Sequence, residues 1–132
     1  MVGAYTAVRR KTVLVVEDDR ATSDLLRDVV EEQGLRFVPA NEGHLALELA
    51  RDERPSVITL DLDLPDTDGH AVLHRLLGDE LTRDIPIVVV TGHARFLPNN
   101  DCHRVAGVLE KPLDVANLAD VLHSLLDEDA LR

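Results

Sequence analysis

Short apolar runs alternate along the chain with longer segments in which apolar residues recur at helical spacing. Most of the runs are unbroken and rich in β-branched residues, which is typical of parallel strands buried on both faces. One weaker run contains Pro39, and proline cannot donate a ladder hydrogen bond, so we expect that strand at a sheet edge. The expected strands are residues 13–16, 36–40, 57–60, 87–90 and 108–109.

The segments between these strands predict amphipathic helices. The first has Asp19 or Arg20 near its start and Gly34 as a left-handed stop after its end. Asp68 is a plausible N-cap of the third helix, which Gly78 closes. The apolar stripes place helices over about residues 21–30, 45–50, 71–77 and 113–126.

The fourth helix is the weak point of this alternation. Residues 95–104 read RFLPNNDCHR, and Pro98 with its polar neighbours makes a poor helix interior. We therefore expect a short or irregular helix in this segment. Asp114 is a plausible cap for the final helix.

Five strands alternating with helices predict an α/β fold, a doubly wound parallel sheet with helices on both faces. The length of 132 residues fits one domain, and no repeat or linker interrupts the pattern. We expect a single domain over residues 1–132, with a core at about 11–126 and an N-terminal extension at 1–10.

Polar residues follow the predicted strands at the points where the strands end. Glu17 and Asp18 follow the first strand, Asp61 and Thr91 follow two others, and Lys111 follows the last. Ligands of such sheets bind beyond the carboxyl ends of the strands, so we expect these five side chains at one edge. Bringing carboxylates together is unfavourable by ~4 kcal/mol per close pair. The site therefore demands a cation, and magnesium, which prefers oxygen ligands, suits it.

The composition excludes several classes of protein. The net charge of -11 argues against gripping a nucleic-acid backbone. Cys102 is the single cysteine and cannot form an internal disulfide. No stretch reaches the ~20 apolar residues of a membrane span, and Arg9 and Arg10 follow the weakly apolar N-terminal part, unlike a secretory signal. We expect a cytoplasmic protein with no membrane or direct nucleic-acid partner.

Four motifs, VLVVEDD, VITLDLDLPDTDG, IVVVTG and VLEKP, occur in this order and resemble the response-regulator receiver domain of two-component signalling. The likeness covers roughly residues 11–126. It implies a flavodoxin-like sheet in the order 2-1-3-4-5. It also implies a phosphoacceptor switch of a phosphorelay, which is not a conventional enzyme because it catalyses only its own phosphorylation and dephosphorylation.

The resemblance implies a role for each site residue. Asp61 looks like the phosphoacceptor, and Glu17 and Asp18 look like the acidic pair that holds Mg²⁺ or Mn²⁺. Asp61 itself and the backbone carbonyl of Asp63 would complete the metal ligands.

The phosphoryl group would be held by the remaining motif residues. Thr91 looks like the switch hydroxyl and Lys111 like the phosphate-binding lysine, while Gly92 leaves the phosphoryl group accessible. The implied partners are a sensor histidine kinase or a histidine phosphotransfer protein, an unknown downstream protein and, as in some members of the family, a second copy in a homodimer.

Two positions bear on the steps after phosphorylation. Val108 stands where many receivers carry an aromatic residue that rotates with the threonine, so coupling to a partner is an open question, with Phe96 as a possible substitute. Asp63 and His93 flank the path of the attacking water in this family, and we hypothesise that they meet and tune dephosphorylation.

Two alternative functions stay open. A receiver that kept its site but lost its coupling would be a phosphorylation-independent interaction module, for which Val108 is the best support. A haloacid-dehalogenase-like phosphohydrolase would use Asp61 and Asp63 as its nucleophile motif, although Pro65 is awkward in that motif and the chain leaves little room for the usual cap.

Overall fold

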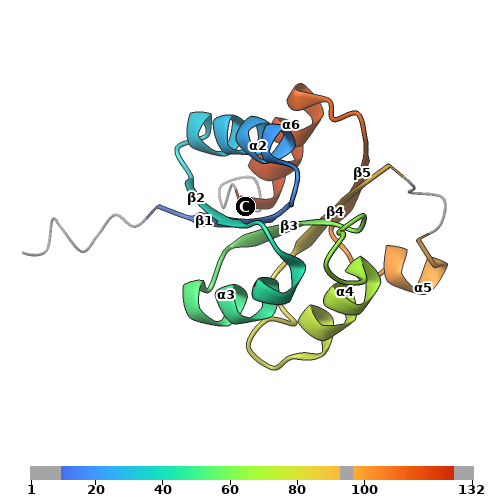
Figure 1. The fold of residues 1–132 in the computed structure, drawn as a ribbon. Helices are drawn as coiled ribbons and strands as arrows, with labels where there is room; N and C mark the ends of the chain where they lie inside the picture. Colours follow the sequence, from blue (N-terminus) through green and yellow to red (C-terminus); the bar gives the residue numbers. More distant parts are fainter. Residues whose placement is uncertain (1–9, 93–96, 127–132) are drawn as a thin grey trace, which may run out of the picture.

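The computed structural model describes residues 10–92 and 97–126, and its central feature is a five-stranded parallel sheet. The strand order is β2-β1-β3-β4-β5, as Figure 1 shows. The strands are β1 (Thr12–Val16), β2 (Arg36–Ala40), β3 (Val57–Asp61), β4 (Ile87–Thr91) and β5 (Gly107–Glu110). The predicted α/β class, parallel sheet and flavodoxin-like order are confirmed.

Helices cover both faces of the sheet (Figure 1). On one face lie α2 (Arg20–Glu32) and α6 (Val115–Leu126), and on the other lie α3 (Ala46–Glu53) and α4 (Gly69–Gly78). A 3₁₀ turn, η1 (Gly43–Leu45), leads into α3, and α5 (Asn99–Cys102) has only 4 residues. The short fourth helix is thus confirmed, although residues 95 and 96 of the predicted segment lie outside the described residues. Among the helices described, none is long and apolar enough to cross a membrane.

Aspartates cap the helices, and Asp68 and Asp114 do so as the sequence predicts. The Asp19 side chain accepts a hydrogen bond from the Thr22 amide at 3.0 Å and caps α2. Asp68 caps α4 in the same way. Gly34 follows α2 with φ +77°, the left-handed conformation that glycine adopts without strain. Asp114 accepts from the amide of Asn117, so the last helix begins at Val115, two residues later than its apolar stripe predicts.

The core consists of two apolar clusters, one on each face of the sheet. Alternate residues of a strand serve opposite clusters. In β1, Leu14 and Val16 pack on the α3 and α4 side, while Val13 and Val15 pack on the α2 and α6 side. Because both faces of β1, β3 and β4 are buried, these strands are apolar at most positions. A strand buried in this way ends where its apolar run ends, and the polar residues begin at that point.

Gly69 allows the first turn of α4 to approach the chain segment that follows β3. A Cβ atom at this position would lie 2.4 Å from the backbone oxygen of Leu62, the residue after Asp61. Backbone atoms cannot move aside as a flexible side chain can. The glycine is therefore required by close packing beneath the site.

We expect Gly69→Ala to lower the free energy of unfolding by about 1–3 kcal/mol, because the loop after Asp61 must shift to admit the methyl group. Gly78→Ala is the matched control, since a Cβ there meets nothing within 4 Å and Gly78 has no positive φ. In a helix this second change raises stability by roughly 0.5–1 kcal/mol. Urea unfolding of both variants measures the difference, and equal stabilities would contradict the packing argument.

Candidate functional site

The carboxyl ends of the strands bring the five predicted site residues together. Asp61 is the last residue of β3 and pairs in register with Val90, one residue before Thr91, which ends β4. Glu17 and Asp18 directly follow β1, and Lys111 directly follows β5. The Lys111 amide donates a hydrogen bond to the Thr91 carbonyl at 2.9 Å. The register of the parallel strands thus brings the five residues to the same edge of the sheet.

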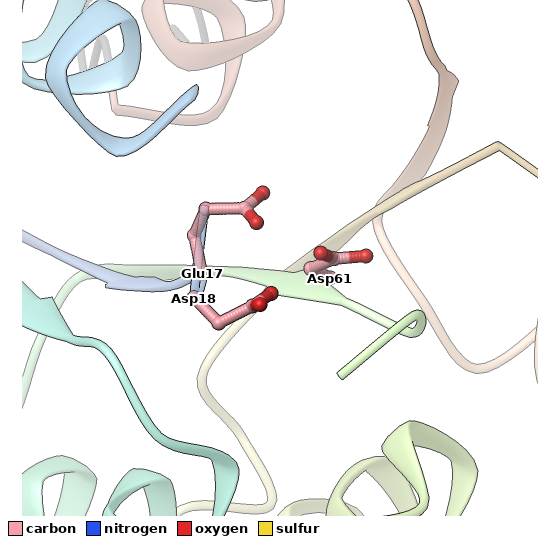
Figure 2. Close-up of side chains that lie close together, drawn as sticks. All are labelled: Glu17, Asp18 and Asp61. Carbon is pink, nitrogen blue, oxygen red and sulfur yellow. The ribbon is translucent and has the colours of Figure 1, made fainter. Parts of the chain in front are cut away.

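Three carboxylates converge at this edge. Figure 2 shows Glu17 and Asp18 reaching from the end of β1 and Asp61 from the end of β3 into the same space. One oxygen of each lies within 4.8 Å of the others. Glu17 and Asp61 are only 1% and 2% exposed, whereas Asp18 is exposed. Two of the three negative charges are therefore largely withdrawn from water.

Lys111 lies between the two buried carboxylates. Its Nζ donates to Asp61 Oδ2 at 3.0 Å and lies 3.4 Å from Glu17 Oε1. Burial lowers the pKa of Lys111, but the hydrogen bond and charge of Asp61 together with the charge of Glu17 outweigh burial and raise it. The ammonium group consequently stays charged at neutral pH and holds Asp61 in place.

Glu17 is the carboxylate least well compensated. Its Oε2 accepts from the Asp19 amide at 3.1 Å, but its buried Oε1 accepts no hydrogen bond from any residue within 10–92 or 97–126. Burial, followed by the neighbouring Asp61 carboxylate, raises the pKa of Glu17 to about 7. A buried carboxylate oxygen without a donor is costly unless it binds a cation.

This donor set fits a hard divalent cation. Three carboxylates share one edge, and all three offer oxygen, the ligand atom that Mg²⁺ and Mn²⁺ prefer. The buried Oε1 of Glu17, which accepts no hydrogen bond from the described residues although Lys111 lies 3.4 Å away, supports this fit. The contribution of the Asp63 backbone carbonyl stays a prediction.

The side chain of Asp63 makes contacts that the sequence did not reveal. Its Oδ2 accepts from the Thr91 hydroxyl at 3.2 Å and from the Gly92 amide at 3.0 Å. The Asp63 amide in turn donates to Asp61 Oδ1 at 2.8 Å. The hypothesis that Asp63 meets His93 concerns a residue outside the described ones. The predicted pairing of β3 with β4 indicates that Asp63 and Thr91 lie near each other. The side-chain rotamer of Asp63 that makes the contact could not be predicted from the sequence.

A second contact unseen in the sequence holds the short helix α5. Asp101 in α5 is 4% exposed, and its Oδ1 lies 3.0 Å from Nε2 of His74 in α4. This pair ties the 4-residue helix to its neighbour. On β5, Val108 is partly buried and packs against the cluster on the α3 and α4 side. Phe96, the suggested substitute for an aromatic rotor, lies outside the described residues.

The fold and the edge cluster define an α/β domain with a buried acidic site beside a charged lysine, and comparisons with known proteins agree. The model of the response regulator receiver domain matches residues 13–123. The polar-differentiation response regulator DivK of Brucella anthropi is 32% identical over 123 residues, which cover 89% of this chain and 98% of DivK. The chain belongs to the response-regulator receiver domain family.

Solved structures share the fold. A sensor protein from Polaromonas sp. JS666 is 34% identical with a TM-score of 0.82, covering 90% of this chain and 98% of the other. The receiver domain of the sensor histidine kinase PA1611 from Pseudomonas aeruginosa PAO1 has a TM-score of 0.80 at 24% identity, covering 91% of this chain and 100% of its own. That structure has a magnesium ion coordinated in its active-site cleft.

We expect magnesium to raise the melting temperature, because the ion relieves repulsion among Glu17, Asp18 and Asp61. At about 100 times its Kd, a ligand of the folded state adds ~2.7 kcal/mol to the free energy of unfolding, which is roughly 10 °C for a domain of this size. Differential scanning fluorimetry with and without chelator measures the shift. Sodium chloride at matched ionic strength is the control, and an equal effect of both salts would show screening alone.

We expect Glu17→Gln to stabilise the metal-free protein increasingly as pH rises from about 4.5 to 7. The unfolded carboxylate ionises near 4.5 and the folded one near 7, so across this window the wild type bears the cost of a buried acid and the glutamine does not. The gain at pH 8 over pH 4 is on the order of 3 kcal/mol. Urea unfolding in chelator measures it, with the exposed Glu48→Gln as the charge-matched control. A gain independent of pH would contradict the assignment.

Proposed function

We propose that this receiver domain is a phosphoacceptor switch in which Asp61 takes a phosphoryl group from a phosphohistidine and the product alters partner binding. One observation carries the proposal: Asp61 is 2% exposed, ends a central strand and accepts a hydrogen bond from Lys111 at 3.0 Å, beside the buried carboxylate of Glu17. This is a carboxylate held by a charged lysine at the edge where a phosphoryl donor can enter. The family as a whole consists of signalling switches rather than conventional enzymes.

The transfer requires position and neutralisation of charge. A carboxylate oxygen of Asp61 attacks phosphorus in line. The new P–O bond forms as the P–N bond of the phosphohistidine breaks, and the electron pair stays on the imidazole nitrogen, which takes up a proton. The product is an acyl phosphate on Asp61.

Each donor at the edge has a part in this scheme. The ammonium of Lys111, the hydroxyl of Thr91 and the amide of Gly92 would each hydrogen-bond a phosphoryl oxygen. Glu17, Asp18, Asp61 and the carbonyl of Asp63 would hold the divalent ion. The bound ion would supply further neutralisation of the phosphoryl charge.

The proposals for magnesium and for the partner proteins rest on likeness to other members of the family. The PA1611 receiver, with magnesium in its cleft, is a precedent for this ion in the same fold. Receiver domains interact with histidine kinases or phosphotransfer proteins, and for this chain we propose one of these as the donor. Homodimerisation and the identity of a downstream protein remain predictions.

A second candidate is favoured by Val108. It packs in the apolar cluster and has no aromatic ring to turn when Thr91 moves. A receiver of this kind would bind its partner whether or not Asp61 is modified. The phosphohydrolase alternative is disfavoured because the family match covers residues 13–123.

We expect incubation with magnesium and a small acyl phosphate to give one phosphoryl adduct per chain, because Asp61 is the buried, lysine-bound nucleophile. Asp61→Ala should give no adduct. Asp84→Ala removes one exposed charge away from the site and serves as the control. Intact-mass spectrometry measures all three. An adduct on the Asp61 variant would contradict the acceptor assignment, and rapid turnover without an adduct would support the phosphohydrolase.

We expect beryllium fluoride, a phosphoryl mimic, to change amide resonances beyond the site, in β5 and α5. The physical reason is that Thr91 and Lys111 anchor the ends of β4 and β5, which pair along their length. Heteronuclear NMR of the magnesium-loaded protein measures the spread. Changes confined to residues touching the ligand would favour the interaction module instead.

A further inference from the structure

We propose that the Asp63 side chain is an internal competitor of the phosphoryl group. In the unmodified protein it occupies the donors that the phosphoryl group would need, the hydroxyl of Thr91 and the amide of Gly92. The inference rests on the proposed function, because it concerns the same site. It adds a residue that sets how readily the site accepts its anion.

The geometry of the contact is specific. Both donors point at one atom, Oδ2 of Asp63, at 3.2 Å from Thr91 Oγ1 and 3.0 Å from the Gly92 nitrogen. The backbone of Asp63 is fixed beside the acceptor, since its amide donates to Asp61 Oδ1 at 2.8 Å. The carboxylate therefore bridges from the loop after β3 to the end of β4, directly across the acceptor residue.

Charge makes the two anions exclusive. A carboxylate oxygen and a phosphoryl oxygen both attract donors strongly because both carry negative charge. One hydroxyl proton and one amide proton cannot serve both at full strength. Asp63 also adds a negative charge to an edge that already holds Glu17, Asp18 and Asp61. The incoming anion must displace the Asp63 side chain outward, and this displacement lowers its apparent affinity.

The exchange of one acceptor for another also determines which side chain moves on phosphorylation. Thr91 already directs its hydroxyl to an anion in the unmodified protein. Arrival of the phosphoryl group replaces one acceptor by another, so the Thr91 hydroxyl has an anionic acceptor in both states. The larger change is at Asp63, which is already exposed and is released toward the surface.

Titration with beryllium fluoride in saturating magnesium tests the competition. Asp63→Ala removes both the charge and the acceptor, and we expect it to bind the mimic about tenfold more tightly than wild type, equivalent to ~1.4 kcal/mol. Asp63→Asn keeps an oxygen that can accept from both donors but lacks the charge, so its affinity should fall between the two. Asp84→Ala controls for net charge and should match wild type.

The Gly92 amide resonance gives a readout that needs no ligand. In the free protein, Asp63→Ala should move this resonance upfield because the amide loses its acceptor, and beryllium fluoride should move it back. Asp84→Ala should leave it in place.

The outcomes separate this inference from the proposed function. Binding of the mimic to wild type and Asp63→Ala with equal affinity, or more weakly to the variant, overturns the competition and leaves the acceptor site intact. An unchanged Gly92 resonance in free Asp63→Ala overturns it as well. Binding to neither protein contradicts the proposed function and the inference together.

Discussion

The convergence of two buried carboxylates, Glu17 and Asp61, on Lys111 is the interaction on which the rest of this structure depends. Glu17 and Asp61 are almost completely buried, so water cannot compensate their charges. Lys111 neutralises part of this charge, but it approaches Glu17 Oε1 without hydrogen-bonding it. The arrangement is tolerable only because the apolar sheet beneath is rigid enough to hold like charges together. The folded protein is thereby prepared for cations.

The same rigidity explains how a small site can be so closely specified. The central strands β1, β3 and β4 are buried on both faces, and the two core clusters hold them in register. The functional residues lie at the carboxyl ends of the strands, either as the last residue of a strand or directly after it. Close contact between Gly69 and the backbone of Leu62 adds a further restraint below the acceptor. The loop after β3 therefore contributes both to the stability of the fold and to the site, because packing leaves its backbone little freedom.

Much of this architecture could be predicted from the sequence, because strands and helix caps depend on residues that are close together along the chain. Strand positions followed from apolar runs, the cap of α4 from Asp68, and the edge position of β2 from Pro39. The gathering of the site residues then followed from parallel topology, while their chemical roles remain proposals.

The features that were not predictable are contacts between side chains from separate loops. The acceptance of two hydrogen bonds by Asp63 depends on its rotamer and on the course of the chain after Thr91. The pairing of His74 with Asp101 likewise depends on where a 4-residue helix docks. No periodicity encodes either contact. The predicted start of α6 was two residues too early for a different reason. The apolar spacing continues through Leu113, although Asp114 is the cap.

Pro39 has a consequence for how molecules of this protein meet at high concentration. The Arg36 amide donates toward β1, to the Lys11 carbonyl, and amides of a strand alternate in direction. The nitrogen of Pro39, three residues later, therefore faces the open side of β2, where a further strand would have to receive a hydrogen bond. Because proline has no proton to give, this border of the sheet is a poor template for β-strand addition. The chain thus limits unintended assembly with a single residue whose ring costs the native sheet no hydrogen bond.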